Sequence, residues 1–117
     1  YQDYGEFCKD RLLAAFAFSA EDFVQAQKIR RVIRNKWDQS LQDFDLILTH
    51  SQPDTTPLLG EPSSTRFMNS FNILGWPAIS IPVGKNQAGL PLGIQLVAKP
   101  WKEGLLLRAA QTIESSQ

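Results

Sequence analysis

The feature that most constrains the fold is a long stripe of apolar residues at helical spacing in the first half of the chain. With about 100° between successive residues, its members fall within an arc of roughly 120°, the width of a helix face that packs against a core. The stripe comprises Phe23, Ala26, Ile29, Ile33, Trp37, Leu41 and Phe44. Ser19-Ala20-Glu21-Asp22 precedes it with a hydroxyl for a free backbone N–H and acids for the first turn. The sequence therefore predicts a helix from this cap to about Gln42, with the stripe facing the core.

Periodicity also predicts the other elements, which together give an α/β chain. The expected order is a helix from about Tyr4 to Ala17, the long helix, a buried strand at Leu46–Thr49, one or two helical turns at Phe67–Leu74 closed by Gly75, strands at Pro77–Val83 and Leu92–Ala98, and a terminal helix from about Lys102 to Glu114. The segment His50–Arg66 is a long loop, of the length that is usually functional or else disordered. The linker between the last two strands is too short for a helical crossover, which predicts an antiparallel hairpin with Pro82 at a strand end or edge.

Composition excludes several classes of protein. The 117 residues suffice for one domain or part of one. Lys and Arg total 12 and Asp and Glu total 12, so no net charge draws the chain to nucleic acid or to an anionic membrane. No apolar run approaches the roughly 18 to 20 residues of a membrane span. A single cysteine, Cys8, and the absence of a signal-peptide pattern predict a reducing, cytoplasmic setting, and the start at Tyr1 predicts further residues upstream.

The residues offer few catalytic candidates. His50, the one histidine, is either a general base at a strand end or an ordinary loop histidine, and the second interpretation is favoured. Ser63 and Ser64 lack the flanking glycines that expose a nucleophile on a tight turn, so we expect loop serines. One Cys and one His give no metal-ligand spacing, and no glycine-rich phosphate loop is present. Trp76 and Trp101, each beside a proline, are left open between core and interface.

The one basic cluster lies at Lys28–Lys36. Helical geometry spreads its cations around the axis, which favours a solvated face over contact with nucleic acid. Arg30 differs because it falls about 40° from Ala26, inside the apolar stripe. A buried guanidinium needs a partner, so the sequence predicts a structural clamp from Arg30 to Asp45 or to carbonyls of the loop at His50–Pro57, with snorkelling of the charge into water as the alternative.

Two phrases carry a resemblance to a known family. Residues 67–84 read FMNSFNILGWPAISIPVG and residues 89–97 read GLPLGIQLV. They resemble the phrases F-T-x-P-F-N-x-x-G-x-P-A-x-S-x-P-x-G and G-L-P-x-G-x-Q-L of the amidase signature family, followed by an acid that opens a final helix, here Glu103. The upstream half is similar as well, so the resemblance spans nearly all of the chain. Departures are Thr49-His50-Ser51 where members commonly have T-P-T, and Met68 and Ser70 in place of Thr and Pro.

The resemblance implies hydrolysis of an amide C–N bond by a Ser nucleophile, a second Ser in a cis peptide and a Lys base, without metal or other cofactor. In the family these three residues lie upstream of the region matched here, so it implies no catalytic residue in this chain. Residues 1–117 would be the C-terminal part of an amidase-signature domain and a fragment of its large mixed β-sheet with packing helices. The segment Thr65–Asn72 would form one wall of the substrate pocket, with Thr65, Phe67 and Met68 as substrate-binding residues.

The expected partners are the remainder of the amidase chain and a small amide substrate, with a homo-oligomer left open. The absence of an acid near Thr65 distinguishes the chain from typical A subunits of the tRNA-dependent amidotransferase and points to a general amidase. The rival hypothesis is a stand-alone, non-catalytic binding or interaction module derived from an amidase. Nucleic-acid binding through the helix at Lys28–Lys36 is the least favoured alternative.

Overall fold

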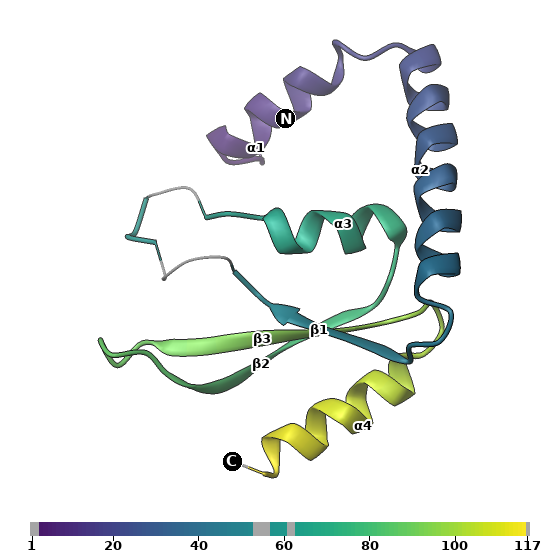
Figure 1. Cartoon of the computed structure of the whole chain (residues 1–117). Coiled ribbons are helices and arrows are strands. Elements are labelled where there is room, and N and C mark those ends of the chain that lie inside the picture. Colours follow the sequence, from purple (N-terminus) through teal and green to yellow (C-terminus); the bar gives the residue numbers. More distant parts are fainter. Residues whose placement is uncertain (1–2, 53–56, 61–62, 117) are drawn as a thin grey trace. The chain divides into compact units, whose positions relative to one another are not determined.

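The computed structural model describes residues 3–52, 57–60 and 63–116. In chain order its elements are α1 (Glu6–Ala15), α2 (Ala20–Ser40), β1 (Leu46–His50), α3 (Arg66–Leu74), β2 (Ala78–Lys85), β3 (Pro91–Ala98) and α4 (Glu103–Glu114), as Figure 1 shows. The chain divides into two compact units, Tyr1–Trp37 and Asp38–Gln117. None of the described helices is both long enough and apolar enough to cross a membrane.

The second unit is built on a three-stranded sheet of order β1-β3-β2. Both neighbouring pairs are antiparallel, which confirms the predicted hairpin of β2 and β3. Asn86 closes its turn, because its side-chain oxygen accepts the backbone N–H groups of Ala88 and Leu90, each at 2.9 Å. Pro82 lies on edge strand β2 beside a shift of register, where a missing backbone donor does no harm.

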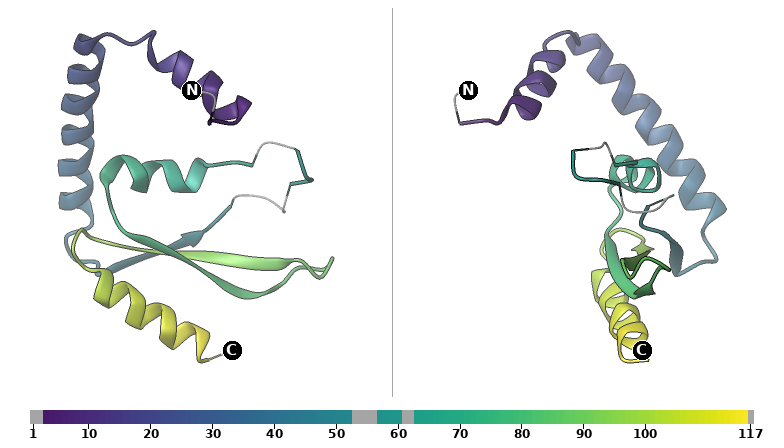
Figure 2. Two further views of the ribbon diagram at one scale, coloured as in Figure 1. Left: turned by 180° about the vertical axis from the view of Figure 1, so that it is seen from behind. Right: turned by 90° about the vertical axis from the view of Figure 1, so that its left-hand side faces the viewer.

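The main core lies between the sheet and α4. Side chains alternate between the two faces of a strand, so Gln95 and Val97 of β3 lie on one face and Ile94, Leu96 and Ala98 on the other. Helix α4 covers this face, whereas α3 lies on the other side of the sheet, as the two views of Figure 2 show. The buried cluster comprises Ile81, Leu96, Ala98, Leu106 and Ala110.

Helix α3 and the turn after it contribute further buried residues. Phe71 and Leu74, three residues apart, are its buried positions, and Trp76 is buried two residues later. The helix ends at Gly75, which has φ 70° and donates its N–H to the Phe71 carbonyl at 2.9 Å. A left-handed backbone conformation favours glycine, so the predicted end of this helix is confirmed with its physical reason.

The first unit contains α1 and most of α2. The predicted cap of α2 is present as a capping box: the Ser19 hydroxyl accepts the N–H of Asp22 at 3.1 Å, and the Asp22 carboxylate accepts the N–H of Ser19 at 2.8 Å. The helix boundaries match the prediction within two residues. Its burial does not, because α2 has no buried residue, and Phe23 and Ile29 are 63% and 59% exposed.

The prediction of a core-facing stripe on this helix is therefore wrong for the chain as described. Helical spacing identifies the face that would pack against a core, but it does not supply the covering element. Phe44, the last member of the stripe, is also exposed. Of the two tryptophans left open, Trp76 belongs to the core, whereas Trp101 is 91% exposed.

Candidate functional site

The segment predicted to form a pocket wall, Thr65–Asn72, comprises the residue before α3 and most of that helix, and the predicted binding residues lie at its start. Thr65 precedes the helix and is exposed, and its carbonyl accepts the N–H groups of Met68 and Asn69, each at 3.0 Å. Phe67 and Met68 are half-buried in this turn. The three residues named from the sequence thus lie together at the start of one helix, with backbone positions fixed by its first hydrogen bonds.

Gln95 connects this turn to the sheet. It lies on the central strand β3, is only 6% exposed, and donates its side-chain N–H to the carbonyl of Phe67 at 3.3 Å. Its partners in register are Thr49 on β1 and Ser80 on β2, so a polar row crosses all three strands. A buried amide is costly unless it is hydrogen-bonded, and this contact partly satisfies it.

A second polar contact joins the two edge strands. The hydroxyl oxygens of Ser51, just after β1, and Ser80, on β2, lie 2.7 Å apart. They meet beside Gly93 of the central strand, where a Cβ would lie 3.1 Å from the Ser51 hydroxyl and 3.3 Å from that of Ser80. Both distances are shorter than an ordinary contact, so glycine leaves the space in which the two hydroxyls meet.

His50 is exposed at the end of β1. Its ring centroid lies 6.4 Å from that of Phe67, with the planes inclined by 40°. Within the described residues the imidazole makes no hydrogen bond to a serine, so the structure brings no base and nucleophile together there. Ser63 and Ser64 are exposed outside any helix or strand, and the Ser64 hydroxyl accepts the N–H of Arg66 at 3.4 Å.

Metal binding finds no support in the described part of the chain. It holds no group of three or more His, Cys, Asp or Glu side chains that could bind an ion. Around the first turn of α3, Phe67 thus lies beside the His50 ring and its carbonyl accepts the side-chain N–H of Gln95.

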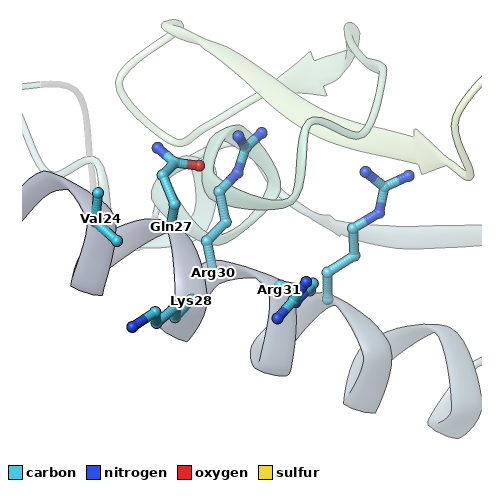
Figure 3. Close-up of a pocket in the computed structure, with 6 residues that line it drawn as sticks. Val24, Gln27, Lys28, Arg30 and Arg31 are labelled. Atoms are coloured by element: carbon cyan, nitrogen blue, oxygen red, sulfur yellow. The ribbon is translucent and has the colours of Figure 1, made fainter.

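The basic cluster lies along a shallow depression on α2. Figure 3 shows its lining side chains: Val24, Gln27, Lys28, Arg30, Arg31 and Arg34. Arg30 is exposed, so the prediction that it is a buried charge is wrong. The reason is the one that applies to the stripe, because helical spacing assigns a residue to a face without showing that the face is buried.

Comparison with known proteins identifies the family. The model of the family described as Amidase matches residues 3–107. The chain belongs to the amidase family. It is 36% identical to the A subunit of the glutamyl-tRNA(Gln) amidotransferase of Wolinella succinogenes, and the match covers 97% of this chain and 28% of that protein. It is 39% identical to a fatty acid amide hydrolase of Oryza sativa subsp. indica, over 87% of this chain and 19% of that protein.

The fold of this amidase-family chain agrees with a solved relative. A crystal structure of an amidase superposes with a TM-score of 0.83 over 98% of this chain and 29% of that one, at 23% identity. The predicted α/β fragment of an amidase sheet is confirmed. The chain spans less than a third of the length of each of these relatives.

Two contacts described above, that of Gln95 with Phe67 and that of Ser51 with Ser80, were not identified from the sequence. Gln95 stands in a run of apolar residues, and its place in the phrase GLPLGIQLV was the available signal. The contact of Ser51 with Ser80 joins residues 29 positions apart on strands that are not neighbours, which periodicity does not reveal.

Proposed function

We propose that residues 1–117 are the C-terminal part of an amidase-signature domain that hydrolyses amide C–N bonds. In this proposal the chain supplies scaffold and one wall of the substrate pocket, while the Ser, cis-Ser and Lys of the catalytic triad lie outside it. The observation that carries the proposal is the family match over residues 3–107, in a chain that spans 28% of one curated relative and 19% of another.

The substrate-binding residues would be Thr65, Phe67 and Met68. Their common place at the start of α3 supports this, as does the half-buried state of Phe67 and Met68. An apolar wall of this kind suits the acyl or amine portion of a small amide, and the chemistry implied by the family needs no metal or other cofactor. The absence of an acid near Thr65 favours a general amidase over one component of an amidotransferase.

The partner would be the remainder of the amidase chain. Exposed apolar residues on α2, including Phe23 and Ile29, are suited to contact with it. A single cysteine, Cys8, is compatible with the cytoplasmic setting that we propose for the protein.

The alternative is a stand-alone, non-catalytic binding module. One observation favours it: the second unit has a buried core of its own between the sheet and α4. Such a module would remain monomeric at high concentration and would unfold cooperatively on its own. The amidase proposal instead expects association through the exposed apolar surface.

An exchange experiment tests the proposal. This chain replaces the matched segment of the rice fatty acid amide hydrolase, and hydrolysis of a fatty acid amide is followed in the chimera. Phe67→Ala and Met68→Ala should each raise KM about tenfold, the scale of a lost apolar contact in a pocket, with a smaller change in kcat. Leu107→Ala on α4 is the matched control, since it removes an exposed apolar side chain from the other side of the sheet.

The chain alone should hydrolyse no amide and should not react with a fluorophosphonate probe, because the proposal places the base that activates the serine nucleophile outside it. Labelling abolished by Ser51→Ala, Ser63→Ala or Ser64→Ala would place catalysis within the chain. A folded chimera without activity, or one indifferent to both wall substitutions, would refute the proposal.

A further inference from the structure

The sheet face that carries Gln95 has a polar contact near the end of β1 and another at the start of α3. Ser51 follows β1, and Phe67 lies in the first turn of α3. Ser51 contacts the sheet beside Gly93, and the Phe67 carbonyl accepts the amide of Gln95. Gly93 and Gln95 are two residues apart on β3, so both contacts lie on one face, roughly 7 Å apart along the strand.

The Ser51–Ser80 contact requires two side chains from non-adjacent strands to meet over Gly93. Strands β1 and β2 are each about 4.8 Å from β3 and are not adjacent, so side chains from them can meet only over the central strand. Ser51 follows the pair His50↔Ile94, which places it opposite Gly93, and its N–H lies 3.5 Å from the Gly93 carbonyl. Ser80 lies diagonally across from Gly93, because Pro82 is the direct partner. The two hydroxyls reach 2.7 Å only because no side chain stands between them.

We infer that Ser51, Ser80 and Gln95 are positioning residues that fix the pocket wall, with Gly93 as the gap that makes the serine contact possible. This sheet-face clamp is defined as the Ser51–Ser80 hydroxyl contact together with the Gln95–Phe67 contact. The positioning role rests on the proposed function, because that proposal assigns Phe67 and Met68 to the pocket wall.

The clamp explains why Ser80 and Gln95 occupy this face, on which Val97 is also buried. On the opposite face β3 presents Leu96 and Ala98 to the core, and apolar residues suffice there to bind α4. Burial of apolar surface is not directional, so by itself it leaves the rotation of a short helix such as α3 less well defined. Hydrogen bonds are directional, so the Gln95 contact orients the first turn of α3, and the Ser51–Ser80 contact holds the chain just after β1 against β2.

Hydrogen exchange on the chain itself tests the clamp. Backbone amides of α3 and of α4 are compared in one sample, so that a local effect is distinguished from a change in global stability. Ser80→Ala should accelerate exchange in α3 about fivefold while leaving α4 unchanged, the scale of one modest hydrogen bond. Ser80→Thr retains a hydroxyl and should restore the exchange rates, whereas Ser115→Ala, at an exposed serine after α4, is the control.

Two further variants separate positioning from ordinary packing. Gly93→Ala should reproduce the effect of Ser80→Ala and add little to it in the double variant, because both remove the same contact. Gln95→Leu should accelerate exchange in α3 while α4 exchanges no faster, since an apolar side chain of similar size keeps the sheet packed.

Parallel acceleration in α3 and α4, additive effects at residues 80 and 93, or failure of Ser80→Thr to restore the rates would overturn the clamp. No substrate enters this experiment, so its failure leaves the amidase proposal intact. Conversely, if Phe67→Ala and Met68→Ala left the activity of the chimera unchanged, the pocket-wall proposal would fail, but the hydrogen-exchange evidence for the clamp would remain.

Discussion

The sheet core makes a quantitative prediction at Leu96. This residue lies on the central strand, is 3% exposed, and belongs to the cluster that α4 covers. Leu96→Ala removes three carbons, each worth about 0.8 kcal/mol of transfer free energy, or roughly 2.5 kcal/mol together. The unfilled space adds a further cost, so we expect the free energy of unfolding to fall by about 3 to 4 kcal/mol.

Leu48 provides a matched control. It is the cross-strand partner of Leu96 in the register of β1 and β3, but it is 62% exposed. The same substitution there removes the same atoms from a side chain that is less than half buried, so the expected loss is about 1 kcal/mol. Urea unfolding followed by circular dichroism gives both values, and unchanged slopes would show that the unfolded states are comparable. Both side chains lie on the same face of the sheet, so equal losses at the two positions, or a larger loss at Leu48, would refute the conclusion that this face is covered at Leu96 and open at Leu48.

Three further predictions concern single residues. Hydrogen bonds from the Ser19 side chain and backbone hold the pKa of Asp22 below its ordinary value of 3.8. The cap should therefore be intact above pH 3.8 and should weaken as the pH falls through the lowered pKa. Ser19→Ala should move the pKa of Asp22, measured by NMR titration, back towards 3.8. Gly75→Ala should cost about 1 kcal/mol in a denaturant titration, because alanine must adopt φ 70° there. Trp101→Gly should raise the free energy of unfolding by about 0.5 kcal/mol, since Trp101 has φ 66° and little packing to lose, and no gain is expected from Trp101→Ala.

Much of the fold was predictable because its signals are local. Periodicity predicted α1, α2, β2, β3 and α4, a short apolar run predicted β1, and Gly75 marked the end of α3. The hairpin of β2 and β3 followed from the length of its linker. The pairing of β1 with β3 was not predicted, because the residues that separate these strands along the chain do not encode which edge β1 joins. Register between distant strands is decided by side chains that meet only after folding.

The candidate site was predictable in part. The resemblance placed Thr65, Phe67 and Met68 in one segment, and the structure places them in one helical turn. It did not give the contacts that hold this turn, since Gln95 reads as one polar residue in an apolar strand. Arg30 shows the opposite error: it was predicted to be buried and is exposed, because a helical wheel says nothing about what covers a face.

The exposed stripe of α2 leads to a last prediction. Helix α4 and helix α2 share the same periodic pattern, but Leu106 of α4 is 4% exposed while Phe23 and Ile29 of α2 are 63% and 59% exposed. Replacing a buried apolar residue by serine is costly, whereas at an exposed position the effect on stability is usually within about 0.5 kcal/mol.

The double variant Phe23→Ser/Ile29→Ser should therefore unfold at nearly the same urea concentration as the parent chain. It should also associate less in sedimentation at high concentration, because it removes apolar surface suited to the rest of an amidase domain. Leu106→Ser is the control, and it should lower stability strongly. A large loss of stability in the double variant would mean that the stripe is buried after all, and unchanged association would mean that this surface is not the one that binds a partner.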